Sequence, residues 1–232
     1  MPTINASKNA VAAASASSFS DAREAVESDS EVLNTTSSNL LSVRYMQSSG
    51  RGGTTVLFTR SYLAFDFTGY TTGTITNLKF YWTSTTSAAA AETVRLVKTT
   101  AFGSSNNFSD YSSTDWYSSL DFSTLYSNSF SWPDASSNNN VSLVSGAITA
   151  AQSDGYLQFA ILQTNDQSGL NPGLDVTNTS YGNWSSNRFN LQFDYADAAY
   201  NRKVNSVVAA SGNKINSIVY ADVSRVNSIT SS

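Results

Sequence analysis

The sequence contains no cysteine and no histidine among its 232 residues. These two absences exclude disulfide bonds, thiolate nucleophiles, zinc sites built from Cys and His, and every mechanism that needs an imidazole base. Carboxylates are therefore the main acid–base groups left for catalysis. The lack of cysteine indicates no redox compartment, because proteins without disulfides occur inside and outside cells.

Charge and long apolar runs are also scarce. Charged residues make up 13% of the chain, with a formal net charge of −4 and a pI near 4.7, so the whole molecule is not expected to bind nucleic acid. No apolar run approaches the ~18 residues that a membrane-spanning helix needs, so no membrane partner is expected. Residues 1–22 are rich in Ala and Ser but lack a continuous apolar stretch, so we expect no secretory signal peptide.

Small polar residues and aromatic residues dominate what remains. Serine, threonine and asparagine supply 42, 24 and 22 residues, beside 12 Phe, 12 Tyr and 4 Trp. The small polar residues are poor in helix interiors, which argues against a helical bundle. The aromatic residues can fill a core, which argues against disorder.

Strict alternation of apolar and polar residues is the clearest structural signal. It predicts strong strands over residues 62–67, 77–83, 156–161 and 189–195, and weaker ones over 40–46, 54–60, 92–99 and 139–145. Each strand is expected to bury one face and expose the other, as antiparallel strands commonly do. The expected core residues are Leu63, Phe65, Leu78, Phe80, Phe159, Leu191 and Phe193. The pattern predicts an all-β protein built as a β-sandwich.

Two short helices and one long irregular segment interrupt this pattern. Residues 19–27 have Ser20 as the expected N-cap, and residues 146–152 are expected to form about one turn before the strand at Tyr156. Residues 101–138 show little periodicity, so they form either a crossover above the core or a functional loop.

The C-terminal segment is an internal repeat with a period of 11 residues. The motif of a basic residue, a β-branched residue, Asn and Ser occurs at 203–206, 214–217 and 225–228. Units this short cannot bury a face alone, so they are expected to stack on each other or on another molecule. Residues 202–232 carry four basic residues and one acidic residue, which leaves a net charge of −7 on the rest of the chain.

The order of these pieces resembles a family of bacteriophage virion proteins. The motifs that carry the resemblance are SDAR (20–23), SGRGG (49–53), RSYLAFDF (60–67), GTITNLKF (73–80), FSDY (108–111), NVSL (140–143) and YLQFAI (156–161). The arrangement is also similar to jelly-roll carbohydrate-binding modules built around an Arg-x-x-Leu-x-Phe-Asp strand. The repeats are similar to the Lys-Val-Asn-Gly-Val tails of phage structural proteins, with Ser206, Ser217 and Ser228 at the usual Gly position.

The resemblance implies a jelly-roll β-sandwich over residues 1–198 and a short β-rich repeat tail over 199–232. The expected function is a non-enzymatic structural component of the virion, such as a head decoration, head fibre or tail-associated protein. Other virion proteins are the expected partners, and the chain is expected to form a homo-oligomer. The tail residues expected to attach or oligomerise are Lys203, Val204, Asn205, Lys214, Ile215, Asn216, Arg225, Val226 and Asn227.

The alternative is an adhesin module that recognises a host-surface glycan. Aromatic rings stack on the C–H groups of sugars, and rings outside the alternating strands are the best candidates for such a platform. They are Tyr111, Trp116, Tyr117, Trp132, Tyr181 and Trp184. A structural interpretation stays open for Trp116 and Trp132, which could instead plug the ends of the sandwich.

The acidic residues offer two further hypotheses. Asp110, Asp115 and Asp121 lie in the irregular segment, where a pair of carboxylates could act as in glycosidases, but turns and caps explain them better. No cofactor is expected. A calcium site is a minor possibility, and its candidate ligands are Asp21, Glu27, Asp29 and Glu31. Arg60 and Asp66 share one face of a strand, and a structural role is expected for both.

Overall fold

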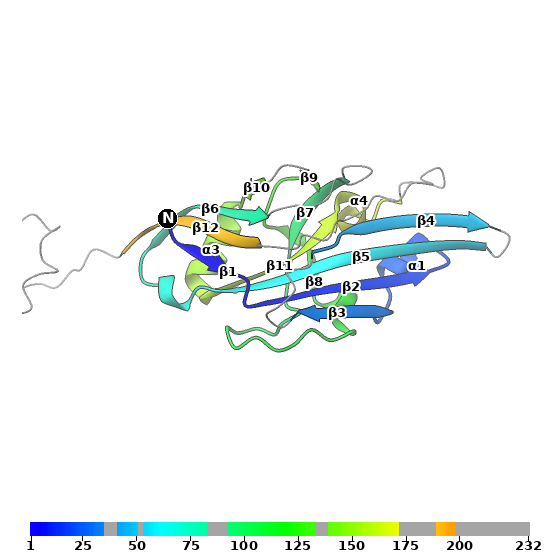
Figure 1. Ribbon diagram of the computed structural model, residues 1–232, viewed down its shortest axis with the longest axis horizontal. Coiled ribbons are helices and arrows are strands. Elements are labelled where there is room, and N and C mark those ends of the chain that lie inside the picture. The colour runs from blue at the N-terminus through cyan, green and yellow to red at the C-terminus, as the bar shows by residue number, and fades with distance from the viewer. Residues whose placement is uncertain (35–40, 51–52, 83–91, 133–138, 172–188, 198–232) are drawn as a thin grey trace, which may run out of the picture. The chain divides into compact units, whose positions relative to one another are not determined.

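The computed structural model describes residues 1–34, 41–50, 53–82, 92–132, 139–171 and 189–197 (Figure 1). All of them lie in one compact unit of the chain, Met1–Ala199. The repeat tail at 199–232 lies outside the described residues, so its strands and its boundary with the sandwich stay predictions.

Two antiparallel sheets make up the described fold (Figure 1). The four-stranded sheet has the order β1 (Thr3–Asn5), β12 (Phe189–Ala196), β6 (Thr74–Trp82) and β10 (Asn139–Ser142). The eight-stranded sheet runs through β3 (Ser30–Asn34), β2 (Lys8–Ala16), β5 (Gly53–Asp66), β11 (Tyr156–Gln163), β7 (Glu92–Thr99) and β8 (Leu120–Leu125). Two further strands complete it: β4 (Arg44–Gly50) pairs with β5, and β9 (Phe130–Trp132) pairs with β7.

Strand β5 is the longest and organises the larger sheet. One of its edges pairs with β2, and the other is shared end to end by β4 and β11. Arg44 of β4 lies opposite Thr59, and Ile161 of β11 lies opposite Ser61. Arg60 therefore stands where β5 changes partners. The two strands predicted at 54–60 and 62–67 are one continuous strand.

The core between the two sheets confirms the predicted β-sandwich and its core residues. The cluster contains all seven expected side chains, Leu63, Phe65, Leu78, Phe80, Phe159, Leu191 and Phe193, each 1% exposed or less. Phe80 of the smaller sheet packs edge-to-face on Phe159 of the larger one, with 5.3 Å between ring centroids. Such pairs add stabilisation beyond the apolar area that they bury.

The expectation that each strand exposes one face to solvent is wrong for the eight-stranded sheet. Its other face carries a second buried cluster that includes Tyr62, Ala64 and Ala160. Phe102 and Trp116, from the segment expected to be either a crossover above the core or a functional loop, cover this face and are 1% and 0% exposed. The larger sheet is thus a middle layer, covered on one side by the smaller sheet and on the other by helices and loops.

Short helices sit at the places where strands end. Helix α1 (Phe19–Arg23) is capped by Ser18, whose Oγ accepts the Asp21 N–H at 3.1 Å, so the expected cap at Ser20 lies two residues too late. Helix α3 (Ser145–Asp154) is longer than predicted and ends at Gly155, whose φ of 72° suits glycine. The remaining helical turns are η1 (Thr68–Tyr70), α2 (Asp115–Ser118) and α4 (Thr164–Ser168).

Replacing Phe193 by Ala should lower the free energy of unfolding by about 3–5 kcal/mol, because it empties a fully buried site. The neighbouring change Gln192→Ala should have little effect, since Gln192 lies on the opposite face of β12 and is half-buried. Chemical denaturation of both variants tests this. Equal effects would mean that the core face of β12 is assigned wrongly.

Candidate functional site

The strongest cluster of polar contacts in the described chain is built on a buried ion pair. The Arg60 guanidinium donates from Nε to Asp166 Oδ2 at 2.8 Å and from Nη2 to Asp166 Oδ1 at 2.7 Å. The two side chains are 0% and 2% exposed. This two-pronged geometry is the strongest that Arg and a carboxylate can form.

The rest of the Arg60 guanidinium is also occupied. Nη1 donates to the Trp116 carbonyl at 2.7 Å, and Nη2 donates to the Arg23 carbonyl at 2.9 Å. The group lies 3.9 Å from the centre of the Trp116 ring, which is within range for a cation–π interaction. Burial alone would lower the pKa of Arg60, but the charge and hydrogen bonds of Asp166 raise it above its ordinary value.

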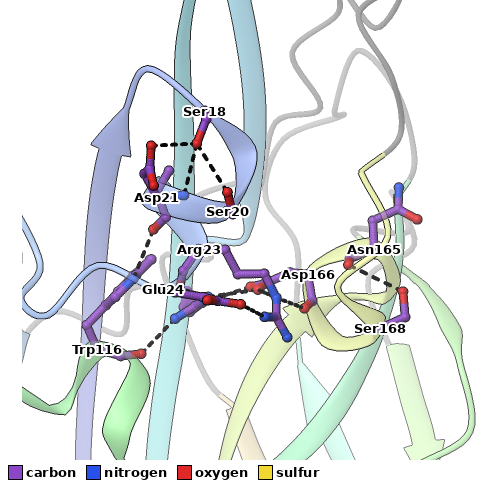
Figure 2. A network of polar contacts seen from close by, with 11 residues as sticks. Ser18, Ser20, Asp21, Arg23, Glu24, Trp116, Asn165, Asp166 and Ser168 are labelled. Carbon is purple, nitrogen blue, oxygen red and sulfur yellow. Dashed lines mark hydrogen bonds and ion pairs between the residues drawn. The ribbon is translucent and has the colours of Figure 1, made fainter.

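A second arginine joins the cluster from helix α1. Figure 2 shows Arg23 beside Asp166, and its Nε donates to the Asp166 carbonyl at 2.7 Å. Its Nη1 donates to Glu24 Oε1 at 2.7 Å, and its guanidinium lies 4.5 Å from the centre of the Phe122 ring. Helix α4 is therefore bound through Asp166 to both α1 and β5.

Trp116 completes the connection between the layers. Its indole Nε1 donates to the Ala22 carbonyl at 3.2 Å, and its own carbonyl accepts the Tyr62 hydroxyl at 2.8 Å. Burial raises the pKa of Tyr62 well above its ordinary value. Strand β5 and helices α1, α2 and α4 thus meet at one point.

This arrangement is suited to structure rather than to chemistry on a substrate. Both carboxylate oxygens of Asp166 accept hydrogen bonds from Arg60, and Asp166 is 1% exposed. A general acid or base must reach a substrate proton within hydrogen-bonding distance, which a carboxylate so enclosed does not do. The cluster fixes the second layer onto the eight-stranded sheet.

Among the aromatic residues predicted for a glycan platform, the three whose side chains are described do not gather on one exposed surface. Trp116 and Tyr111 are 0% and 4% exposed, so neither ring is available to a sugar, and both belong to the second buried cluster. Tyr117 is half-buried, with its ring 5.2 Å from that of Phe122. The side chain of Trp132, and all of Tyr181 and Trp184, lie outside what the structure describes.

The three aspartates considered for catalysis have separate partners. Asp110 pairs with Lys8 at 2.6 Å, and Asp115 Oδ2 accepts the Ser112 N–H at 2.9 Å. Asp121 accepts the Thr124 hydroxyl at 2.7 Å. Burial raises the pKa of Asp115, whereas hydrogen bonds from Ser123 and Thr124 lower that of Asp121. The contacts of Asp115 and Asp121 are those of turns and caps, as the preferred interpretation predicts, whereas Asp110 pairs with a residue of strand β2.

Among the acidic residues proposed for calcium, those whose side chains are described do not converge on one site either. Asp21 Oδ2 accepts the Ser18 hydroxyl at 2.6 Å, and Asp29 Oδ2 accepts the Ser15 hydroxyl at 2.7 Å. In the part of the chain that is described, no three acidic side chains come close enough together to hold a metal ion. The side chain of Glu31 and the tail residues expected to attach lie outside that part.

Sequence reasoning missed Asp166 as the partner of Arg60. Asp66, which shares a strand face with Arg60, is exposed and accepts the Thr68 N–H at 2.9 Å. The signal in the sequence was the position of Asp166, which lies in the short helix α4 that begins where β11 ends, and β11 is the strand that pairs with β5 next to Arg60.

No protein-family model matches this sequence, and a search of curated proteins finds no similar sequence. Among the described residues, no helix is both long and apolar enough to cross a membrane.

Replacing Asp166 by Asn should destabilise the fold by about 3–5 kcal/mol, because it leaves the Arg60 charge buried without its counterion. The matched control is Asp110→Asn, which breaks the exposed pair with Lys8 and should cost about 1 kcal/mol or less. Denaturation midpoints of the two variants test this. Similar midpoints would show that the buried pair does not organise the layers.

Raising the pH should weaken the fold between about pH 10 and 12. Burial raises the pKa of Tyr111 and of Tyr126 from 10.0 to about 12 in the folded chain. Their contribution to stability is complete below pH 10 and is lost as the pH rises through 12, because the unfolded chain ionises first. Denaturation at several pH values measures this. A variant with both residues changed to Phe should show a shallower decline, and an unchanged decline would contradict the assignment.

Proposed function

We propose that the chain is a non-enzymatic structural component of a bacteriophage virion, acting as a head decoration, head fibre or tail-associated protein. In this proposal the β-sandwich is exposed on the particle. The tail at 199–232 binds other virion proteins or further copies of the chain.

The observation that carries the proposal is the separation of charge and repeat along the chain. Lys203, Lys214 and Arg225 recur every 11 residues, within a segment of net charge +3 that follows an acidic body of net charge −7. A regularly spaced basic segment is suited to an acidic protein surface, either on a neighbouring copy or on the particle.

The buried ion pairs of the β-sandwich support a structural role. Arg60 and Asp166 are enclosed and paired, and Arg23 is shared between Asp166 and Glu24. Their contacts stabilise the layers and are not presented to a substrate.

The connections between the two sheets support the more specific proposal that the β-sandwich is a jelly roll. The chain passes from the smaller sheet to the larger one between β1 and β2, and back again between β5 and β6. It crosses four more times, between β6 and β7, between β9 and β10, between β10 and β11, and between β11 and β12. Repeated crossing between two antiparallel sheets is typical of jelly rolls.

Reversing the tail charges should prevent incorporation of the protein into particles. The full-length variant with Lys203, Lys214 and Arg225 changed to Glu would repel an acidic partner surface. Its matched control changes Ser206, Ser217 and Ser228 to Ala in the same repeats without altering charge. Quantitative mass spectrometry of purified particles measures the copy number of each form.

The proposal predicts that the wild type and the Ser variants are present in particles and that the charge-reversed variant is absent. Full occupancy by the charge-reversed variant would overturn the attachment role of the tail. Absence of the wild-type protein from particles, together with binding to host cells, would favour the adhesin alternative instead.

A further inference from the structure

Strand β3 stands at the end of the eight-stranded sheet, and no described strand pairs with its outer edge. Its inner edge pairs antiparallel with β2, from Asn34 opposite Asn9 to Ser30 opposite Ala13 (Figure 1). The outer edge of such a strand presents backbone N–H and C=O groups that a further strand can pair with.

Acidic side chains gather in the segment that leads into β3. Residues 21–29 run from helix α1 to this strand and carry four exposed carboxylates, those of Asp21, Glu24, Glu27 and Asp29. The Asp29 N–H donates to the Ala13 carbonyl at 2.8 Å, so Asp29 continues the pairing of β3 with β2. We call the outer edge of β3, together with these four side chains, the acidic edge.

Basic residues do not neutralise the acidic edge from within the same segment. Its one basic residue, Arg23, is 8% exposed and is bonded to Asp166 and to Glu24 (Figure 2). Asp21 and Asp29 accept hydrogen bonds from the hydroxyls of Ser18 and Ser15, which bring no opposite charge. The acidic edge therefore keeps most of its negative charge.

An exposed apolar side chain lies in the middle of this segment. Val26 is 82% exposed, more than any other large apolar side chain of the described residues. It stands between Glu24 and Glu27 in the sequence. A partner with both basic and branched aliphatic side chains would cover the charges and this apolar surface together.

Acidity distinguishes this edge from the other border strands of the two sheets. Strands β1, β4, β9 and β10 contain no acidic residue, and β8 contains only Asp121, which accepts hydrogen bonds from Ser123 and Thr124. Two acidic edges would repel each other, which disfavours pairing of β3 with a second β3. A basic strand is the complementary partner.

The chain itself contains segments with these properties. The repeats at 203–207, 214–218 and 225–229 each begin with a basic residue and have a β-branched residue at the second and fifth positions. β-Branched residues favour strands. Each of these segments is five residues long, as is β3.

The number of repeats indicates that the added strand comes from a second copy of the chain. The described body offers one acidic edge, whereas the tail offers three equivalent repeats. Its own body could therefore bind no more than one of them, and the others are left for the edges of other copies. Several such links in one assembly strengthen each other through a high effective concentration.

We propose that the acidic edge is the docking site for a tail repeat of a second copy, which lies along β3 as an added strand with its basic residue against the carboxylates. The inference rests on the proposed attachment role of the tail, and it names the surface that receives the tail. The contact joins two different surfaces, so it builds rings or chains of copies rather than symmetric pairs.

Disulfide cross-linking of two full-length variants tests this docking site, because the chain contains no cysteine of its own. One variant is Ser30→Cys, at an exposed position of β3, and the other is Ser206→Cys, within the first repeat. A disulfide requires the two Cα atoms to approach within about 7 Å. Mild oxidation of the mixture should give a disulfide-linked heterodimer, which mass spectrometry of the joined peptides identifies.

Two matched cysteines measure the background of random collision. Ser48→Cys places the thiol at an exposed position of β4, and Ser211→Cys places it between two repeats. Replacing either partner by its control should abolish the heterodimer above that background. Thermal melting of each variant verifies that it is folded.

A charge reversal at the edge tests the electrostatic part of the proposal. Glu27 is exposed, and Glu27→Lys added to the Ser30→Cys variant replaces an attraction to the basic repeat by a repulsion. The yield of heterodimer should fall about fivefold. Glu27→Gln, which only removes the charge, should have a smaller effect.

Three results would overturn the proposal. They are a heterodimer yield no higher than that of the two controls, a yield that Glu27→Lys leaves unchanged, and a chain with both Ser30→Cys and Ser206→Cys that closes only an internal disulfide. If cross-linking fails while the protein is present in purified particles, the docking site is wrong and the virion role stands. Absence of the protein from particles contradicts the virion role and leaves the cross-linking result unaffected.

Discussion

The contact between Arg60 and Asp166 is the constraint on which the layered arrangement depends. A buried guanidinium is tolerated only when its charge and its N–H groups all find partners. Arg60 lies in β5 where that strand changes from β4 to β11, and its partners come from α4, α2 and α1. Helices α1, α2 and α4 of the second layer must therefore all reach their places before the charge is fully compensated. This requirement ties the packing of that layer to a single point of the eight-stranded sheet.

The alternating pattern was sufficient for the strands of the sandwich core, since period-two burial depends only on local sequence. It could not show that the reverse face of the larger sheet is also covered. Tyr62 and Ala64 look like exposed positions when only one face is assumed to be buried, yet they lie under a segment distant in sequence. The strand β2 was missed for a related reason. Its Ala10, Ala12 and Ala14 have low strand propensity, and tertiary packing against α1 outweighs that preference.

The candidate sites show the same division between local and long-range information. Trp116 was a reasonable glycan candidate because it lies outside the regular strands, but irregular backbone does not mean an exposed side chain. Tyr81 and Asn190 were recognisable as the polar side of their strands. Their position opposite each other depends on which strands pair and in which register, and the residues that pair are more than 100 positions apart. Long-range pairing of this kind is not encoded in any local pattern.

The pairing of β1 with β12 brings the first residues of the chain beside the last described strand, where Ile4 lies opposite Leu191. During synthesis the N-terminal strand therefore emerges long before its partner exists. The smaller sheet can close only after residue 196 has left the ribosome, while β2 already has its partner in β5. Contacts so distant in sequence form slowly, and the edge of β6 that β12 covers stays unpaired and open to association until β12 arrives. The order of translation thus makes closure of the smaller sheet the late step in maturation of this fold.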